Sequence, residues 1–292
     1  MRFGAHVPVA GGYDKTIAYA REIGCECMQV FAKSPRQWVG TPMDPERAVS
    51  FVVARRDSEL GPLFTHTAYL INVATSDAAL RERSIAALAD ELVRAAMLGA
   101  EGVVTHVGND PDSDAEAAAM RVGSAVREAL SLAEDAGVRV RLLLENSAGA
   151  GRSFGCSFEE LGACIAAADL AADRLGVCFD TCHAFAYGMP LESDEGWDWV
   201  LSRLDRAVGL ERLGLVHAND CLYERGSRRD RHAWVGDGFI GREGFSAMVC
   251  RPELADTCAC IEVAGEMPYK DIENLGRLKA LRRECAPSQS TL

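Results

Sequence analysis

Short apolar runs alternate with longer amphipathic stretches along the whole chain. The short runs are typical of buried strands, whereas apolar residues spaced by three and four positions predict helices. After Ser76, for example, Leu88, Leu92 and Ala95 fall on one helical face that ends at Gly99. The pattern predicts strands at residues 2–6, 25–31, 63–66, 102–106, 138–145, 176–180, 214–219 and 258–263.

Helix signals follow the strands in a regular order. Gly24 ends the first helix, Asp44-Pro45-Glu46 opens the second, and Ser157 is placed to cap a later one. The main predicted helices cover residues 14–23, 114–136, 157–168, 197–210 and 270–281, with others after Asp44, after Ser76 and near Phe245. Eight strand-helix units predict an α/β fold, a TIM (β/α)8 barrel. Without a compositional break, we expect a single domain over residues 1–292 with a flexible tail at 285–292.

Composition indicates a globular chain of 292 residues, 48% of them hydrophobic and 25% charged. No apolar run approaches the ~20 residues of a membrane span, and the start of the chain lacks a secretory signal. We therefore expect a cytoplasmic protein with no membrane association, close to the nucleoid if it comes from a bacterium.

The eleven cysteines raise the question of disulfides or thiolate metal sites. The count is odd, the chain is large and no export signal is present, so reduced thiols are expected. Cys25 and Cys27, like Cys258 and Cys260, sit two apart in apolar runs without a Cys-x-x-Cys pair. Buried thiols are favoured over zinc knuckles.

Metal-binding side chains recur where the predicted strands end. Because the carboxyl ends of barrel strands converge on one face, these side chains are expected to gather there. All six histidines of the chain lie at strand ends or in the loops that follow. Asp180 alone could equally be a helix cap, but the joint pattern favours a metal cluster. The strand-end residues are His6, His66, His106, Glu145, Asp180, His217 and Glu262.

Nine candidate donors are too many for one or two ions with open positions. Three ions would use them if one carboxylate bridges. Mixed imidazole and carboxylate ligation suits zinc (Zn²⁺), with Mn²⁺ or Fe²⁺ as substitutes. Close metal pairs support in-line phosphoryl displacement by water. The nine donors are His66, His106, Glu145, Asp180, His183, His217, Asp230, His232 and Glu262.

The net charge of −12 argues against general electrostatic binding of nucleic acid. Carboxylates that surround divalent cations add to this negative count although the cations cancel their charge, so attraction of nucleic acid to a local metal site remains open. The loop at residues 225–232 carries four arginines among two candidate donors. Such a run is often a solvated face, but near metal ions it favours phosphate contact, with Arg228 and Arg231 as the candidates.

Several motifs in combination resemble the endonuclease IV family of apurinic/apyrimidinic (AP) endonucleases over nearly the full length. The matching residues are Gly4-Ala5-His6-Val7 with Gly11-Gly12, Arg36-Gln37-Trp38, His66 with Tyr69-Leu70-Ile71-Asn72, Glu145-Asn146 with Ala148-Gly149, Asp180-Thr181-Cys182-His183-Ala184-Phe185, His217 with Asn219-Asp220, Asp230-Arg231-His232, and Gly236-Asp237-Gly238 before Ile240-Gly241. The stretch around His106 and the residues after Glu262 depart from the family pattern, which affects loop details more than the ligands.

The resemblance implies a trinuclear zinc site that acts on DNA. It assigns His66, His106 and Glu145 to one ion, Glu145, Asp180, His217 and Glu262 to a second, and His183, Asp230 and His232 to a third. Glu145 and Glu262 are the residues to which it ascribes catalysis. The implied reaction cleaves the phosphodiester bond 5′ to an abasic site in double-stranded DNA and leaves 3′-hydroxyl and 5′-deoxyribose phosphate ends, as in base excision repair.

The family's DNA-probing residues match Arg36, Tyr69 and Leu70. Insertion is physically reasonable, because an abasic site has no base to unstack. Ordinary loop packing is the alternative for Tyr69 and Leu70, and a solvated or capping arginine is the alternative for Arg36. His6 is expected either to support the ligands or to face DNA. A monomer is expected.

Two other functions stay open. A metal-dependent sugar isomerase or epimerase would use the same barrel and strand-end donors, but it needs one or two ions and has no role for His183, Asp230 and His232. A non-catalytic scaffold that binds DNA lesions would keep the metals as structural elements. The range of DNA 3′-end substrates and the physiological metal do not follow from the sequence.

Overall fold

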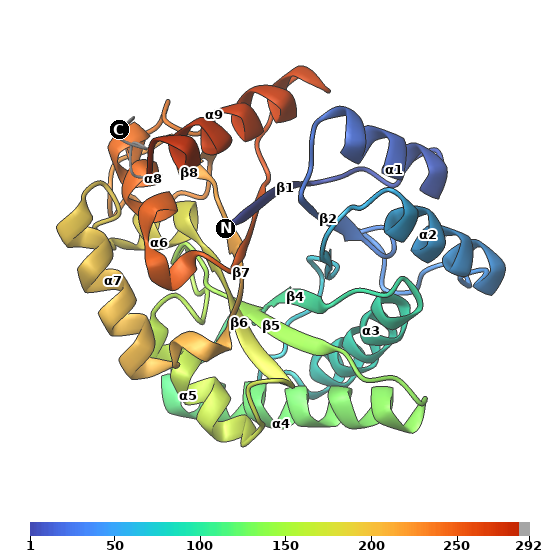
Figure 1. Cartoon of the computed structure of the whole chain (residues 1–292). Helices are drawn as coiled ribbons and strands as arrows, with labels where there is room; N and C mark the ends of the chain where they lie inside the picture. The colour runs from blue at the N-terminus through green and yellow to red at the C-terminus, as the bar shows by residue number, and fades with distance from the viewer. Residues whose placement is uncertain (286–292) are drawn as a thin grey trace.

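The eight predicted strands close into one parallel barrel. The computed structural model describes residues 1–285, with the hydrogen-bonded strand order β1-β10-β7-β6-β5-β4-β3-β2. Figure 1 shows the helices as a ring around these strands, which confirms the predicted TIM barrel. The barrel strands are β1 (Arg2–His6), β2 (Cys27–Phe31), β3 (Leu63–His66), β4 (Gly102–His106), β5 (Arg141–Glu145), β6 (Leu175–Asp180), β7 (Leu213–His217) and β10 (Cys258–Ile261).

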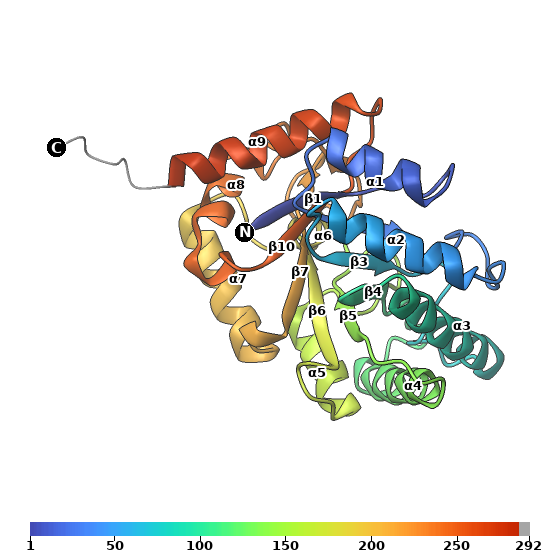
Figure 2. The ribbon, with the colours of Figure 1, turned by 45° about the vertical axis from the view of Figure 1, so that its right-hand side comes forward.

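The helices follow the strands in the predicted order. Aspartate or serine side chains cap six of them, and Ser157 and Glu160 form a complete capping box on α5. The last helix packs beside the first strand, so the two ends of the described chain meet (Figures 1 and 2). The helices are α1 (Tyr13–Glu22), α2 (Pro45–Asp57), α3 (Ala78–Met97), α4 (Ala115–Asp135), α5 (Phe158–Ala168), α6 (Thr181–Tyr187), α7 (Asp194–Ala207), α8 (Gly241–Cys250) and α9 (Tyr269–Cys285).

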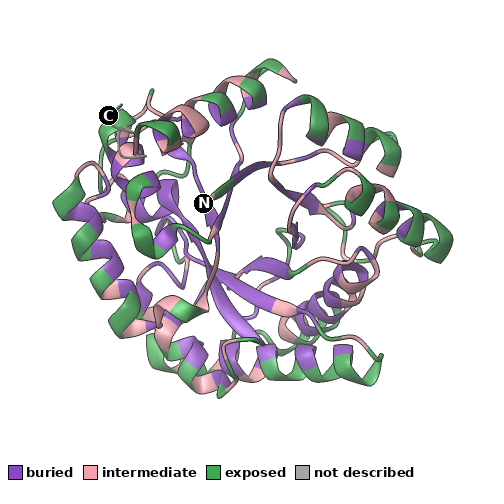
Figure 3. Cartoon of the chain, in the orientation of Figure 1, coloured by how far each residue is buried: buried purple, intermediate pink, exposed green. Residues whose placement is uncertain are grey.

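Apolar side chains fill two separate layers. One layer lies between the strands and the surrounding helices and includes Phe3, Leu92 and Trp197. The other fills the barrel interior, where residues such as Phe64 and Leu143 are buried. Figure 3 accordingly shows buried strands and helices whose outer sides are exposed. Because apolar side chains fill the barrel interior, the polar side chains that could form a site gather where the strands end. Among residues 1–285, no helix has the length and hydrophobicity needed to cross a bilayer.

Two predicted strands begin later than expected. β2 starts at Cys27 because the N–H of Cys25 donates to a carbonyl of α1, and β5 starts at Arg141 because the N–H of Val138 closes α4. In each case the residue follows a glycine with positive φ, Gly24 or Gly137, and its N–H helps to end the preceding helix.

Two regions predicted as loops contain regular structure. His183 lies in the short helix α6, where Asp180 is the N-cap and its carboxylate accepts the N–H of His183 at 2.8 Å. The long loop after β7 contains β8 (Asp220–Cys221) paired antiparallel with β9 (His232–Ala233). This hairpin returns His232 to the barrel.

One cysteine pair contradicts the expectation of reduced thiols. Cys250 and Cys285 form a disulfide with 5.3 Å between their Cα atoms. They end α8 and α9, which pack side by side, and sequence spacing does not reveal that proximity. The remaining nine cysteines are free, as expected, with Cys27, Cys258 and Cys260 inside the barrel. Of the predicted tail, Cys285 ends α9 and the rest lies outside the described residues.

Candidate metal centre

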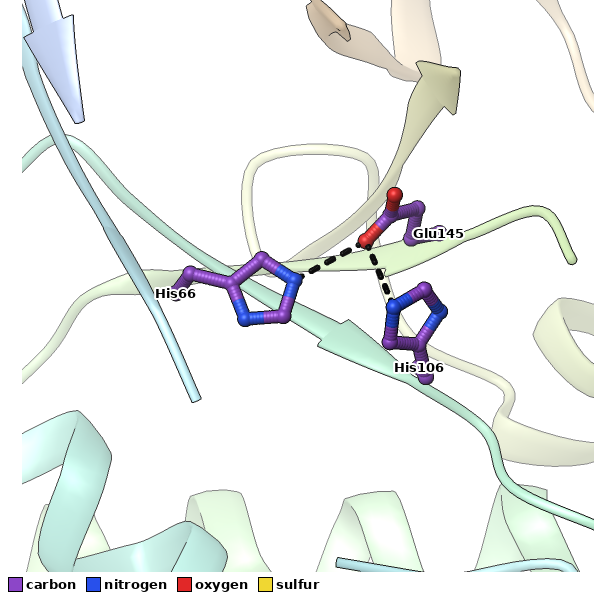
Figure 4. Close-up of side chains that lie close together, drawn as sticks. All are labelled: His66, His106 and Glu145. Carbon is purple, nitrogen blue, oxygen red and sulfur yellow. Dashed lines mark hydrogen bonds and ion pairs between the residues drawn. The ribbon is translucent and has the colours of Figure 1, made fainter. Parts of the chain in front are cut away.

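Glu145, the last residue of β5, lies at the centre of the donor cluster. It is 1% exposed, and its two carboxylate oxygens face different groups of histidines. Oε2 lies 3.0 Å from His66 Nε2 and 3.4 Å from His106 Nε2. Figure 4 shows both imidazoles directed at this one oxygen. Oε1 lies 3.0 Å from His217 Nδ1 and 3.4 Å from His183 Nδ1. One carboxylate therefore connects two groups of donors.

All nine predicted metal donors come together at this end of the barrel. They form three sets in which the donor atoms lie within 4.8 Å of one another. The sets are His66, His106 and Glu145; Glu145, Asp180, His217 and Glu262; and His183, Asp230 and His232. Cys182 adds a further combination with Asp180 and His232, although its thiol donates to the carbonyl of Arg231 at 3.6 Å.

The histidine hydrogen bonds fit metal ligation. A metal-binding imidazole usually donates its second ring N–H to a nearby acceptor, which fixes the tautomer. His66 Nδ1 donates to the carbonyl of Thr67 at 2.8 Å, while its Nε2 faces Glu145. The same arrangement joins His183 Nδ1 to the Asn146 carbonyl (2.9 Å) and His232 Nδ1 to the Glu262 carbonyl (3.0 Å). The buried Nε2 of His232 has no hydrogen-bond partner in the described structure and lies 3.3 Å from Asp230 Oδ1, as an atom reserved for an ion would.

Gln29 on β2 supports the second donor set and was not singled out from the sequence. Its Nε2 donates to Glu262 Oε1 at 2.7 Å, and its Oε1 accepts the Nε2–H of His217 at 2.9 Å. His6 Nδ1 lies 2.9 Å from the same amide nitrogen. A fully buried amide in an otherwise apolar strand is the signal that could have identified it.

Asp180 combines the two roles that the sequence left open. One carboxylate oxygen caps α6, and the other accepts from Asn219 Nδ2 at 2.8 Å while facing His217 Nδ1 at 3.7 Å. The Asn146 side chain holds the Asp180 backbone on both sides, with bonds of 2.8 and 3.0 Å. The helix cap thus orients the carboxylate that faces the cluster.

The cluster stabilises positive charge. Burial alone would raise the pKa of Glu145, but the surrounding imidazoles, that of His106 foremost, hold the pKa well below its ordinary value. At Asp230, the nearby imidazoles of His183 and His232 likewise outweigh burial and lower the pKa. The Asp230 carboxylate in turn outweighs the effect of burial on His232 and raises the pKa of His232 to about 9. Divalent cations are the species that such grouped carboxylates favour.

A cavity of about 490 Å³ opens beside the donors. Its lining combines His106, His183 and Asp230 of the cluster with Tyr69 and Leu70 of the loop after β3. Tyr69 is 63% exposed and Leu70 36% exposed, although both are large apolar or aromatic residues. An exposed pair of this kind at the edge of a polar cavity suits contact with a ligand.

The predicted DNA contacts have different surroundings. Arg36 is exposed on the loop after β2, as a DNA-facing residue would be. Arg228 donates to the Gly149 carbonyl at 3.2 Å and lies over the ring of Tyr187, and Arg231 donates to the Asp230 carbonyl at 2.7 Å. Arg228 is therefore engaged with neighbouring elements, and Arg231 with the backbone of its own loop. DNA contact by these residues and by His6 stays a prediction.

Comparison with known proteins decides the family. A family model described as xylose isomerase-like TIM barrel matches residues 17–280. A protein of Chloroflexus aurantiacus named "Probable endonuclease 4" is 41% identical over 281 residues, which cover 96% of this chain and 98% of that protein. The chain belongs to the endonuclease IV family. It is accordingly an endonuclease IV-like enzyme, as the sequence motifs predicted.

Solved structures agree with this membership. The crystal structure of endonuclease IV from Thermus thermophilus has a TM-score of 0.85 at 38% identity and covers 97% of this chain and 100% of that chain. A D-tagatose 3-epimerase-like protein has a TM-score of 0.74 at 21% identity, with 98% of each chain covered. The second likeness shows a shared barrel fold alone, and it carries no functional argument.

Proposed function

We propose that this enzyme hydrolyses the phosphodiester bond 5′ to an abasic site in double-stranded DNA, using three zinc ions. The products would be a 3′-hydroxyl and a 5′-deoxyribose phosphate, and the reaction would serve base excision repair by a monomer. The observation that carries the proposal is the division of Glu145 between two donor sets, beside a third set formed by His183, Asp230 and His232. Mn²⁺ or Fe²⁺ could occupy the same donors.

The donor sets assign the residues their roles. Glu145 would bridge the first two ions, and Glu262 would complete the second set opposite His217, whose Nδ1 lies 3.4 Å from Glu262 Oε2. When bound, such ions lower the pKa of water towards 7 and stabilise the attacking and leaving oxygens of an in-line displacement. The protein side chains keep their donor atoms fixed and supply no nucleophile of their own.

The loops beside the cluster would select the lesion. Tyr69 and Leu70 are exposed at the cavity, and Arg36 lies on the neighbouring loop. Extruding an abasic nucleotide costs less than extruding an intact one, because no base stacking is lost. We infer that these three residues occupy the gap in the duplex while the phosphate approaches the donors.

The test is cleavage of a synthetic duplex with one abasic site, with an undamaged duplex of the same sequence as control. Untreated protein should cut only the lesion strand, on the 5′ side, and chelator-treated protein should not cut until Zn²⁺ is restored. Equal cutting by both preparations would reject the proposal. Conversion of an aldose to a ketose without DNA cleavage would favour the isomerase.

A further inference from the structure

The two loops proposed to probe DNA are connected by a buried ion pair. Lys33 lies on the loop that carries Arg36, and Glu91 lies on α3, which follows the loop that carries Tyr69. Lys33 Nζ is 3.5 Å from Glu91 Oε1, and the two side chains are 2% and 1% exposed. Because burying two charges is costly, a pair in this place needs further hydrogen bonds to persist.

Lys33 fixes both ends of its own loop. Its ammonium donates to the carbonyl of Trp38 at 3.0 Å and to Asp90 Oδ2 at 3.0 Å. Trp38 lies two residues after Arg36, and its ring is covered by the guanidinium of Arg83 at 4.3 Å. Residues 33–38 are thus held against α3 at each end, with Arg36 between them.

Glu91 fixes the second loop. The carboxylate oxygen that faces Lys33 also accepts the N–H of Ala68 at 3.1 Å, directly before Tyr69. The N–H of Tyr69 in turn donates to the carbonyl of Pro35 at 3.2 Å. The loops are therefore joined twice, once through the ion pair and once through their backbones.

The choice of lysine is informative in this chain. Only four of its 31 basic residues are lysines. A compact ammonium with three donors can reach the Trp38 carbonyl, Asp90 and Glu91 from within a buried site, whereas a planar guanidinium would need a wider space.

We propose that Lys33 and Glu91 are positioning residues that hold the Arg36 loop and the Tyr69–Leu70 loop in a DNA-ready arrangement before DNA binds. This inference rests on the proposed function, which gives the loops their DNA role. Loops that are ordered in advance lose less conformational freedom on binding, so the lesion is bound more tightly. Within residues 1–285 neither side chain belongs to a metal donor set, so the chemical step should not depend on them.

The test uses the double variant Lys33→Met/Glu91→Gln, which leaves no unpaired buried charge and so should fold. Single-turnover cleavage of the abasic duplex over a range of enzyme concentrations separates half-saturation from the limiting rate. The enzyme concentration at half-saturation should rise by about tenfold or more, because the loops must then become ordered as DNA binds. The limiting rate and the metal content should stay as in the wild type, and hydrogen exchange over residues 34–39 should become faster. The matched control is Arg139→Met/Asp173→Asn, a remote pair with 66% and 64% exposed side chains.

Unchanged half-saturation in the double variant would overturn the inference. A lower limiting rate together with lost metal would also overturn it, because the pair would then support the metal centre. Arg36→Ala and Tyr69→Ala are measured in parallel. If both retain wild-type half-saturation, the proposed DNA role of the loops fails. If both weaken binding and the double variant does not, only the role of the ion pair fails.

Discussion

Gln29 accepts a hydrogen bond from Nε2 of His217 at 2.9 Å, and this bond determines which ring nitrogen of His217 faces the donor cluster. The same amide donates to Glu262 at 2.7 Å, so its oxygen and nitrogen cannot exchange places without losing both bonds. One side chain on β2 therefore orients two proposed ligands, His217 at the end of β7 and Glu262 directly after β10. Metal sites generally depend on partners of this kind.

Replacing Gln29 with methionine should weaken the second metal site while the fold is retained. Methionine has a similar volume but neither accepts from His217 nor donates to Glu262. Metal affinity should fall about 10–100-fold, the usual cost of losing such a partner. Competition with a chromophoric chelator measures it. Thr65→Val is the control, because Thr65 is also fully buried and its hydroxyl has no partner among the described residues. Equal metal affinity in Gln29→Met and the wild type would contradict this role.

Replacing Glu145 with glutamine should abolish cleavage. The neutral amide cannot supply two anionic oxygens, so the first and second donor sets would lose their shared ligand. Cleavage activity should fall by more than the about 10–100-fold that follows when a residue supporting a metal ligand is removed. Circular dichroism should show an intact barrel, and Glu128→Gln, whose side chain is 56% exposed, serves as control. Wild-type cleavage by Glu145→Gln would remove the bridging role.

The fold and the donors at the strand ends were predictable because both follow from local patterns. His66, His106, Glu145, Asp180 and His217 each end a parallel strand, and barrel closure brings such ends together whatever the helices contain. Knowledge of strand order was sufficient, and no side-chain geometry was needed. The exact helix and strand limits mattered little for this outcome.

Other features depend on packing between distant elements. Gln29 has the position of an ordinary core residue within its strand, and only the closed barrel shows that it reaches His217. Cys250 and Cys285 end different helices, so their pairing depends on how α8 and α9 meet. The role of Glu91 likewise depends on tertiary contacts with two loops.

Replacing His183 with asparagine should remove one ion and leave the other two. His183 Nε2 lies 3.3 Å from Asp230 Oδ2, and both belong to the third donor set, which shares no residue with the first. The zinc content, measured by elemental analysis, should fall from about three ions per chain to about two. Cys182→Ser is the matched control and should keep all three. Loss of every ion from His183→Asn would show that the sets do not bind independently.

The ion pair between Glu26 and Arg282 should make barrel stability depend on pH. Burial alone would raise the pKa of Glu26, but Arg282 donates to both carboxylate oxygens at 2.7 Å and the N–H of Phe3 donates at 3.0 Å. These bonds hold the pKa below its ordinary value. Because the folded-state pKa is lowered, the stabilisation is complete above the unfolded pKa of about 4.3 and disappears as pH falls through the folded pKa.

Thermal unfolding of Glu26→Gln and of the wild type therefore should differ at pH 7 and converge in acid. At pH 7 the variant should melt about 2 °C lower, the shift that a loss of roughly 1 kcal/mol produces in a domain of nearly 300 residues. Glu26 precedes β2 and Arg282 lies on α9, so loss of the pair loosens the contact between the first and last elements of the described chain. Glu284→Gln, which breaks the exposed pair with Arg242, should leave the midpoint unchanged. A difference between Glu26→Gln and wild type that persists undiminished well below pH 4 would show that the Glu26 charge is not its source.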